Sequence, residues 1–158
     1  MMRKRIISQS PKEPSSADQN WLDLESLARV EITSEDEGHP IDSALTAGDG
    51  PGWMAAEPGE QIIRVFFDEP QAISHIHLVF AEEKRERTQE FLLRWSGDGG
   101  RSYWEIVRQQ YTFNPSGATR EVEDYTVKLH GVTALELKIV PDISRGEARA
   151  ALVQLRLA

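Results

Sequence analysis

His75 and His77 are the residues of this sequence whose type and spacing most directly suggest chemistry. They lie two positions apart in an apolar segment, so on a β-strand both side chains would point to one face and could share a metal ion. A metal site needs further ligands, and no obvious third ligand lies near them in the sequence. We therefore favour surface-facing or partly packed histidines over a metal site.

Three carboxylates surround the turn that precedes Trp53, namely Asp42, Asp49 and Glu57. Such groups could bind calcium, or hydrolyse a glycoside if two of them were held about 5 to 9.5 Å apart in a cleft. No nucleophile elbow, phosphate-binding loop, histidine-rich metal motif or Cys–His pair accompanies them. We therefore predict no catalytic residues and no enzymatic activity.

The segment from Ser96 to Trp104 combines turn residues with two aromatic residues and fits an Asp-box pattern, Ser-x-Asp-x-Gly-x-x-Tyr. Asp boxes occur in propellers, which require repeated blades, and no internal repeat is found in this sequence. We interpret the segment as a structural hairpin turn. In this interpretation Asp98 caps backbone amides and Trp104 packs inward.

The histidines, the carboxylates and the Asp98 turn would be positioned by short segments in which apolar and polar residues alternate. Six segments alternate with a period of two, which is typical of strands with one buried face. Their predicted inward sets are Ile63, Val65 and Phe67; Ile76, Leu78 and Phe80; Phe91, Leu93 and Trp95; Tyr125, Val127 and Leu129; Leu135, Leu137 and Ile139; and Val153, Leu155 and Leu157.

Two less regular segments, 27–34 and 104–111, bring the expected number of strands to about eight. The separators are rich in turn-forming residues; Asp68-Glu69-Pro70 and Asn114-Pro115-Ser116-Gly117 are examples. The pattern predicts an all-β protein, an antiparallel sandwich or barrel.

Length and composition are those of one soluble globular domain, with 158 residues and 28% charged residues. Residues 1–20 are polar enough to predict a flexible N-terminal tail, which leaves residues 21–158 as the domain. The net charge of -8 argues against a nucleic-acid partner, and no apolar run is long enough to span a membrane. The absence of cysteine and of an apolar signal sequence leads us to expect a cytoplasmic protein.

The order of several short motifs resembles that of the coagulation-factor type C, or discoidin, domains of the galactose-binding-like superfamily. The first part of the resemblance consists of an Ala-rich turn, an Asp-Gly, a Trp, a Pro-Gly and a strand; here these are Ala44, Asp49-Gly50, Trp53, Pro58-Gly59 and Gln61–Phe67. The second part consists of the strand and Ser-x-Asp-Gly turn at Leu93–Gly99, the step Trp104-Glu105-Ile106-Val107 and the closing strand Leu152–Leu157.

The resemblance implies an eight-stranded jelly roll whose loops at one end bind ligands. In sugar-binding members, Arg side chains from such loops hydrogen-bond hydroxyls while an aromatic ring stacks on the sugar. The mixed-charge run Glu82–Arg87 is by default a solvated loop. In the functional interpretation, Trp53, Arg85 and Arg87 are the candidate ligand-binding residues.

Some members of the family also hold a structural calcium ion, through the loop around Asp49 and through a Glu in the last strand. The matching last-strand residue is Gln154, which is neutral and a poorer ligand for a hard dication. We therefore expect no cofactor, with Asp49 as the candidate ligand if calcium binds.

The leading hypothesis from the sequence is a non-catalytic module that binds a carbohydrate. The alternative is an intracellular protein-interaction or assembly module of the same fold, whose partner would be another protein. The sequence leaves the oligomeric state open.

Overall fold

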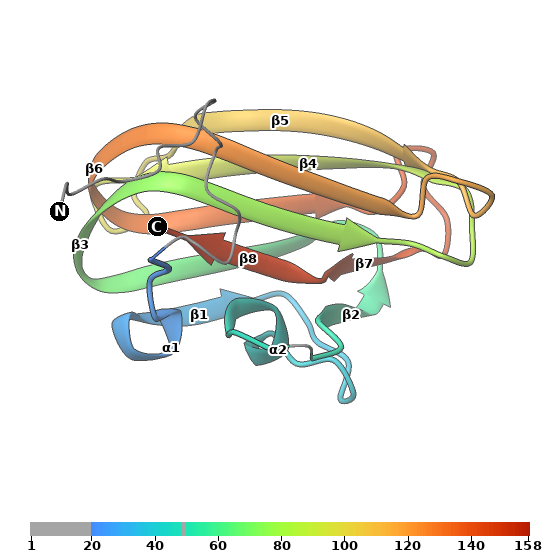
Figure 1. Cartoon of the computed structure of the whole chain (residues 1–158), viewed down its shortest axis with the longest axis horizontal. Coiled ribbons are helices and arrows are strands. Elements are labelled where there is room, and N and C mark those ends of the chain that lie inside the picture. Colours follow the sequence, from blue (N-terminus) through green and yellow to red (C-terminus); the bar gives the residue numbers. More distant parts are fainter. Residues whose placement is uncertain (1–19, 49) are drawn as a thin grey trace, which may run out of the picture.

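The computed structural model describes residues 20–48 and 50–158, so residues 1–19 of the predicted tail lie outside it. Strands dominate the described part of the chain (Figure 1). In chain order the elements are α1 (Leu24–Leu27), β1 (Ala28–Ile32), α2 (Asp42–Leu45), β2 (Trp53–Pro58), β3 (Gln61–Ala81), β4 (Arg87–Ser96), β5 (Trp104–Phe113), β6 (Arg120–Val140), β7 (Arg149–Leu152) and β8 (Gln154–Leu157).

Six of these strands form one antiparallel sheet that folds over on itself. The first layer has the order β1, first half of β3, second half of β6, β4 and β5. The second layer contains the first half of β6, the second half of β3 and β8. β2 and β7 pair separately. The result is an antiparallel β-sandwich of the jelly-roll type, which confirms the predicted fold class.

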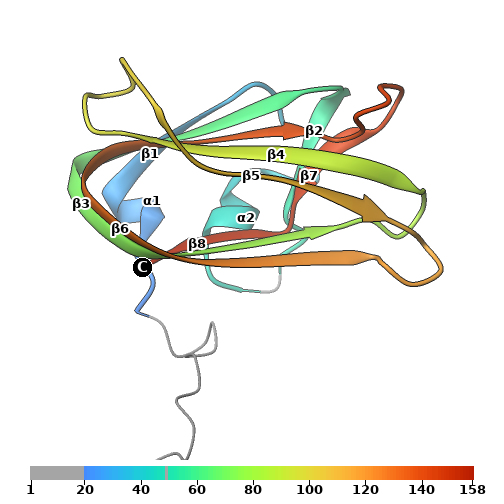
Figure 2. The same cartoon turned by 90° about the horizontal axis from the view of Figure 1, so that it is seen from above.

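Both long strands, β3 and β6, pass from one layer to the other through a bend at the same end of the molecule (Figure 2). Their pairing is irregular between Phe66 and His75, around the exposed segment Asp68-Glu69-Pro70. β6 contains Gly131 with a φ of 67°, a backbone conformation that L side chains rarely adopt. The prediction that residues 68–70 separate two strands is therefore wrong, because the chain bends there within a single strand.

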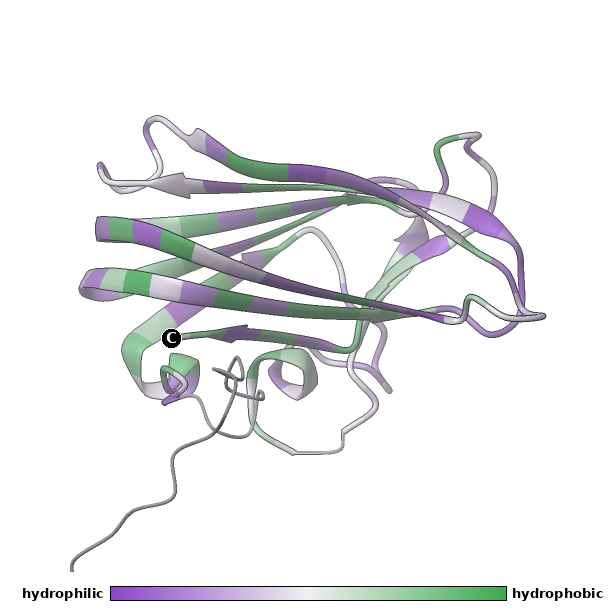
Figure 3. Ribbon diagram, turned by 45° about the horizontal axis from the view of Figure 1, so that its top comes forward, coloured by the Kyte–Doolittle hydropathy of each residue, from purple (hydrophilic) through white to green (hydrophobic). Residues whose placement is uncertain are grey.

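The core lies between the two layers and is built from the alternating positions of the strands (Figure 3). Ile63, Val65 and Leu137 face it from the first layer, and Ile76 and Leu78 face it from the second, each no more than 1% exposed. Inward positions are odd in the first half of β3 and even in the second half. The irregular pairing at the bend accommodates this change of parity.

The two single-turn helices, α1 and α2, lie against each other beside β1 and β8 (Figure 1). Leu24 and Leu45 are buried and connect these helices to the core. Among the described residues, no helix combines the length and the apolar character that crossing a membrane requires.

Candidate functional site

The end of the sandwich opposite the bends is formed by loops, and one of its hollows carries polar groups suited to ligand binding. The hollow has a volume of about 360 Å³ and lies between the β2–β3 turn and the loop from β6 to β7. It is lined by Gly59, Glu60, Val140, Pro141, Asp142, Arg145, Gly146 and Ala148. We call it the loop-end hollow.

The β6–β7 loop is tied to β4, which gives the loop-end hollow a defined wall. Pro141 O accepts a hydrogen bond of 2.6 Å from Arg87 Nη1. Ile143 N donates to Thr88 O at 2.9 Å. Asp142 Oδ1 accepts from both the backbone N and the Oγ of Ser144, at 3.0 and 2.7 Å. These bonds hold the loop against the sheet without using the Arg145 side chain.

Arg145 is exposed and has a φ of 69°, the one positive value among the described residues other than glycine. Such a conformation costs energy and persists only when the surroundings enforce it. Across the hollow, Glu60 Oε1 lies 3.2 Å from Lys138 Nζ. A guanidinium and two carboxylates around an apolar floor could donate to and accept from the hydroxyls of a sugar.

A second polar cluster flanks the β2–β3 turn, where Gly59 pairs with Arg149. Asp36 Oδ2 lies 2.9 Å from His39 Nδ1, and Asp36 Oδ1 lies 3.9 Å from Arg149 Nη1. The hydrogen bond with His39, the backbone N–H of Gly38 and the positive charge of Arg149 together hold the pKa of Asp36 below its ordinary value. Asp36 is therefore a carboxylate at neutral pH.

Trp53 does not present its ring to a ligand. It is 1% exposed, and its Nε1 donates a hydrogen bond of 3.0 Å to Ser34 O. The indole fills the core while its one polar atom is satisfied, as buried tryptophans require. The burial contradicts the prediction that Trp53 stacks on a sugar.

Arg87 is also buried, at 4% exposure. Its Nε donates to Glu82 Oε1 at 2.8 Å, its Nη1 donates to Gln89 Oε1 and Pro141 O, and its guanidinium lies 4.8 Å from the ring centre of Phe113. Arg87 therefore holds the loop end together, and the prediction that it contacts a ligand is wrong.

Arg85 lies exposed in the β3–β4 loop, and its role in binding stays a prediction. Asp49 lies outside the described residues, and the predicted calcium role therefore stays a prediction as well. Across the parts of the chain that the structure describes, no group of three or more His, Asp or Glu side chains could hold a metal ion.

His75 and His77 are partners of a single carboxylate. Asp124 Oδ1 lies 3.1 Å from His75 Nε2 and 2.6 Å from His77 Nδ1. His77 is 7% exposed, and the Trp21 ring lies against both imidazoles. The histidines share one face of β3, as the spacing predicts, and they are partly packed.

The turn after β4 is organised by Asp98, as the sequence predicts. Asp98 Oδ1 accepts from the backbone N of Arg101 and of Ser102, at 3.1 and 3.0 Å, and its Oδ2 accepts from Ser102 Oγ. These bonds, with a further one from Ser96 Oγ, hold the pKa of Asp98 well below its ordinary value.

The inward packing predicted for Trp104 is wrong, because this residue is 64% exposed. Trp104 begins β5, the edge strand of the first layer, where the pairing with β4 shifts by one residue between Leu93 and Arg94. Tyr103 is the packed aromatic residue instead. Its ring centre lies 4.8 Å from the Arg94 guanidinium, against the outer face of the layer.

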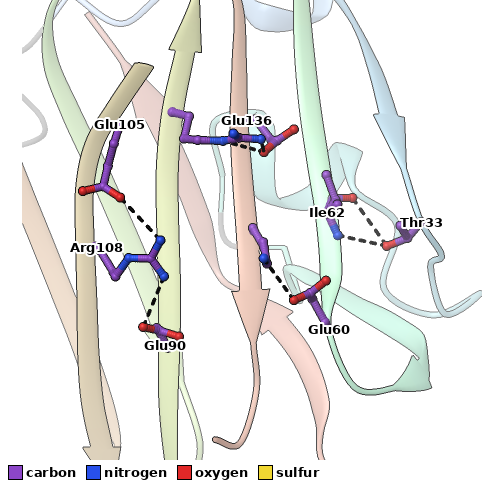
Figure 4. A network of polar contacts seen from close by, with 9 residues as sticks. Thr33, Glu60, Ile62, Glu90, Glu105, Arg108 and Glu136 are labelled. Carbon is purple, nitrogen blue, oxygen red and sulfur yellow. Dashed lines mark hydrogen bonds and ion pairs between the residues drawn. The ribbon is translucent and has the colours of Figure 1, made fainter. Parts of the chain in front are cut away.

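The outer face of the first layer carries charges of alternating sign across its strands (Figure 4). At its centre Glu136 is 1% exposed and accepts from Arg64 Nε at 2.8 Å and from Arg94 Nε at 3.0 Å. Burial opposes the charged form, but the two arginines outweigh it and hold the pKa of Glu136 below its ordinary value. This network stabilises the sheet and leaves Glu136 no free oxygen.

A buried carboxyl group on β6, that of Glu121, was not predicted from the sequence. Glu121 is 1% exposed between the layers, and Gln89 Nε2 donates to its Oε1 at 3.3 Å. Burial and the neighbouring Glu123 raise the pKa of Glu121 to about 8. The sequence did contain a signal for this placement, because Glu121 and Glu123 alternate along the strand with Tyr125, which was predicted to face inward.

No known family model matches this sequence, and no curated protein is significantly similar to it. Solved structures match it over most of its length. The third carbohydrate-binding module of family 32 from a Clostridium perfringens family 31 glycoside hydrolase has a TM-score of 0.67 at 15% identity, with 92% of this chain and 98% of that chain covered.

Two further structures of the same kind contain a ligand. The family 32 module of C. perfringens NanJ, in complex with galactose, has a TM-score of 0.64 at 12% identity and covers 85% of this chain and 95% of its own. The family 32 module of AlyQ, in complex with 4,5-unsaturated mannuronic acid, has a TM-score of 0.63 at 14% identity. The match covers 89% of this chain and 98% of the AlyQ module. This chain therefore shares their jelly-roll fold.

Proposed function

We propose that this chain is a non-catalytic carbohydrate-binding module, related in fold to discoidin domains, and that the loop-end hollow is its sugar site. The observation that carries the proposal is the hollow itself, which Glu60, Asp142 and Arg145 line at one end of a jelly roll. Structural neighbours with the same fold bind galactose and an unsaturated uronic acid. Fold alone does not establish a ligand, so the polar groups of the hollow are essential to the argument.

The geometry favours a neutral sugar bound weakly. The carboxylates of Glu60 and Asp142 are balanced by Arg145 and by Lys138, which pairs with Glu60, so the hollow has no net positive charge that would attract a uronate. None of the described residues that line the hollow is aromatic, so binding rests on hydrogen bonds that each contribute about 0.5–1.5 kcal/mol. We expect a dissociation constant on the order of 0.1–1 mM for a monosaccharide.

Isothermal titration with galactose tests the proposal in the variant Arg145→Asn. Asparagine tolerates the positive φ of residue 145, so the loop keeps its shape while the guanidinium is lost. We expect the affinity to fall by about tenfold, the equivalent of 1.4 kcal/mol.

The matched control is Arg101→Asn, because Arg101 is exposed in the turn at the opposite end of the sandwich. It should bind galactose as the unaltered protein does. Equal affinities for all three proteins, or no binding of galactose or of any other neutral sugar on a glycan array, would exclude the loop-end hollow as a sugar site.

A further inference from the structure

A second hollow, remote from the loop end, is built by the segment that leads into α1, the end of α2 and β8. Its volume is also about 360 Å³. The described residues that line it are Trp21, Leu22, Asp23, Leu24, Glu25, Leu45, Thr46, Ala47 and Arg156, and none of these lines the loop-end hollow. We call it the Trp21 hollow.

The aromatic wall of the Trp21 hollow is held in place before any ligand arrives. Leu22 N donates a hydrogen bond of 2.7 Å to Leu157 O, which ties the segment to β8. The Trp21 ring centre lies 5.6 and 6.0 Å from the rings of His75 and His77. Both histidines are fixed in turn by Asp124.

Arg156 joins this wall because β8 pairs with β3, which places it opposite His77. The Arg156 guanidinium lies 5.8 Å from the centre of the Trp21 ring. The Arg156 guanidinium lies over the indole ring and places hydrogen-bond donors next to the apolar surface that the rest of the indole presents. A preorganised site of this kind loses little conformational entropy when it binds.

We propose that the Trp21 hollow is a second carbohydrate site, one that takes a neutral hexose such as galactose. The C–H face of the sugar packs on the Trp21 indole, and Arg156 donates to ring hydroxyls. The carboxylates of Asp23 and Glu25 accept from other hydroxyls, and Ser26 Oγ already orients the Asp23 carboxylate through a bond of 2.7 Å. The same two carboxylates repel a uronate.

The consequence is a module with two separate sugar sites. When two sites engage one polymer, the second binding event becomes intramolecular, so a galactose-containing polysaccharide is retained far more strongly than the monosaccharide. The inference assigns the same ligand class as the proposed function, but it rests on different residues and is tested independently of it.

Fluorine NMR of the full chain labelled with 5-fluorotryptophan provides a site-specific test. The chain has four tryptophans, and the Trp21→Phe variant identifies the Trp21 resonance. Galactose should shift that resonance in a saturable manner, and galacturonate should not. Arg156→Gln should weaken the galactose affinity reported by Trp21 by about tenfold.

Arg145→Asn separates this inference from the loop-end site, because it should leave the Trp21 titration unchanged. A Trp21 resonance that does not move with galactose would overturn the inference. So would a titration that is unaffected in Arg156→Gln, or one that disappears in Arg145→Asn. Far-ultraviolet circular dichroism of each variant confirms that the sandwich is folded, and Arg156→Lys, which keeps the charge, should retain part of the affinity.

Discussion

The buried carboxyl of Glu121 should make the stability of this protein fall as the pH rises through neutrality. In the folded chain, burial first and the neighbouring Glu123 second raise its pKa to about 8, from an ordinary value of 4.5. At a pH between these two pKa values, the carboxyl of Glu121 is ionised in the unfolded chain and still protonated in the folded chain. The free energy of unfolding therefore decreases with pH across this window.

The magnitude follows from the width of the window. Each pH unit lowers the free energy of unfolding by at most about 1.4 kcal/mol. The two pKa values are roughly 3.5 units apart, so the total loss cannot exceed about 5 kcal/mol. The hydrogen bond from Gln89 and the positive charge of Arg87 favour the charged form of Glu121, so the effect is smaller than this ceiling. We expect a loss of about 2–4 kcal/mol between pH 5 and 8.5.

Urea unfolding at a series of pH values, followed by tryptophan fluorescence, measures this loss. The variant Glu121→Gln keeps a group that can bond Gln89 but cannot ionise, so at pH 8.5 it should be more stable than the unaltered protein. At pH 5 the two should agree within about 1 kcal/mol.

The exposed residue Glu83 provides the matched control. Glu83→Gln should follow the pH dependence of the unaltered protein. A difference between Glu121→Gln and the unaltered protein that stays constant from pH 5 to 8.5 would refute the assignment of this titration to Glu121.

Three further predictions follow from the packing. Glu136→Ala should lower the free energy of unfolding in urea by about 2–4 kcal/mol, because it removes the shared partner of Arg64 and Arg94. The exposed control Glu105→Ala should lower it by less than about 0.5 kcal/mol. Equal losses in the two variants would contradict the proposed role of the Glu136 network. Trp53→Ala should lower the free energy of unfolding by about 3–5 kcal/mol because Trp53 is buried, and Trp104→Ala should lower it by less than about 0.5 kcal/mol because Trp104 is exposed. A larger loss for Trp104→Ala than for Trp53→Ala would contradict the burial of these two residues. Asp98→Ala should speed hydrogen exchange at the amides it caps, and unchanged exchange would disprove the cap.

The strand pattern is the part of this structure that could be predicted from the sequence. Period-two alternation identified the inward residues of both long strands, because a side chain's face depends only on its position along a strand. The alternation missed β2 and β7, which are short and contain alanines at buried positions, Ala55 and Ala150. It also divided β3 at Pro70, where the chain bends and continues.

The candidate site was harder to predict, since burial of a polar side chain depends on partners far away in the chain. Arg85 and Arg87 have similar neighbours in sequence, yet one is exposed and the other is enclosed by Glu82, Phe113 and Pro141. Local composition carries no information about such an enclosure.

The sequence by itself determined the all-β class, the faces of the strands and the turn held by Asp98, because alternation and turn chemistry act between near neighbours. Only the tertiary structure decided which charged and aromatic residues are available to a ligand. Glu136 lies 72 positions from Arg64, and Trp21 meets Arg156 only because β8 closes the sheet beside the segment before α1. Contacts of this kind depend on which distant strands pair with each other, and the spacing of residues along the chain does not predict that pairing.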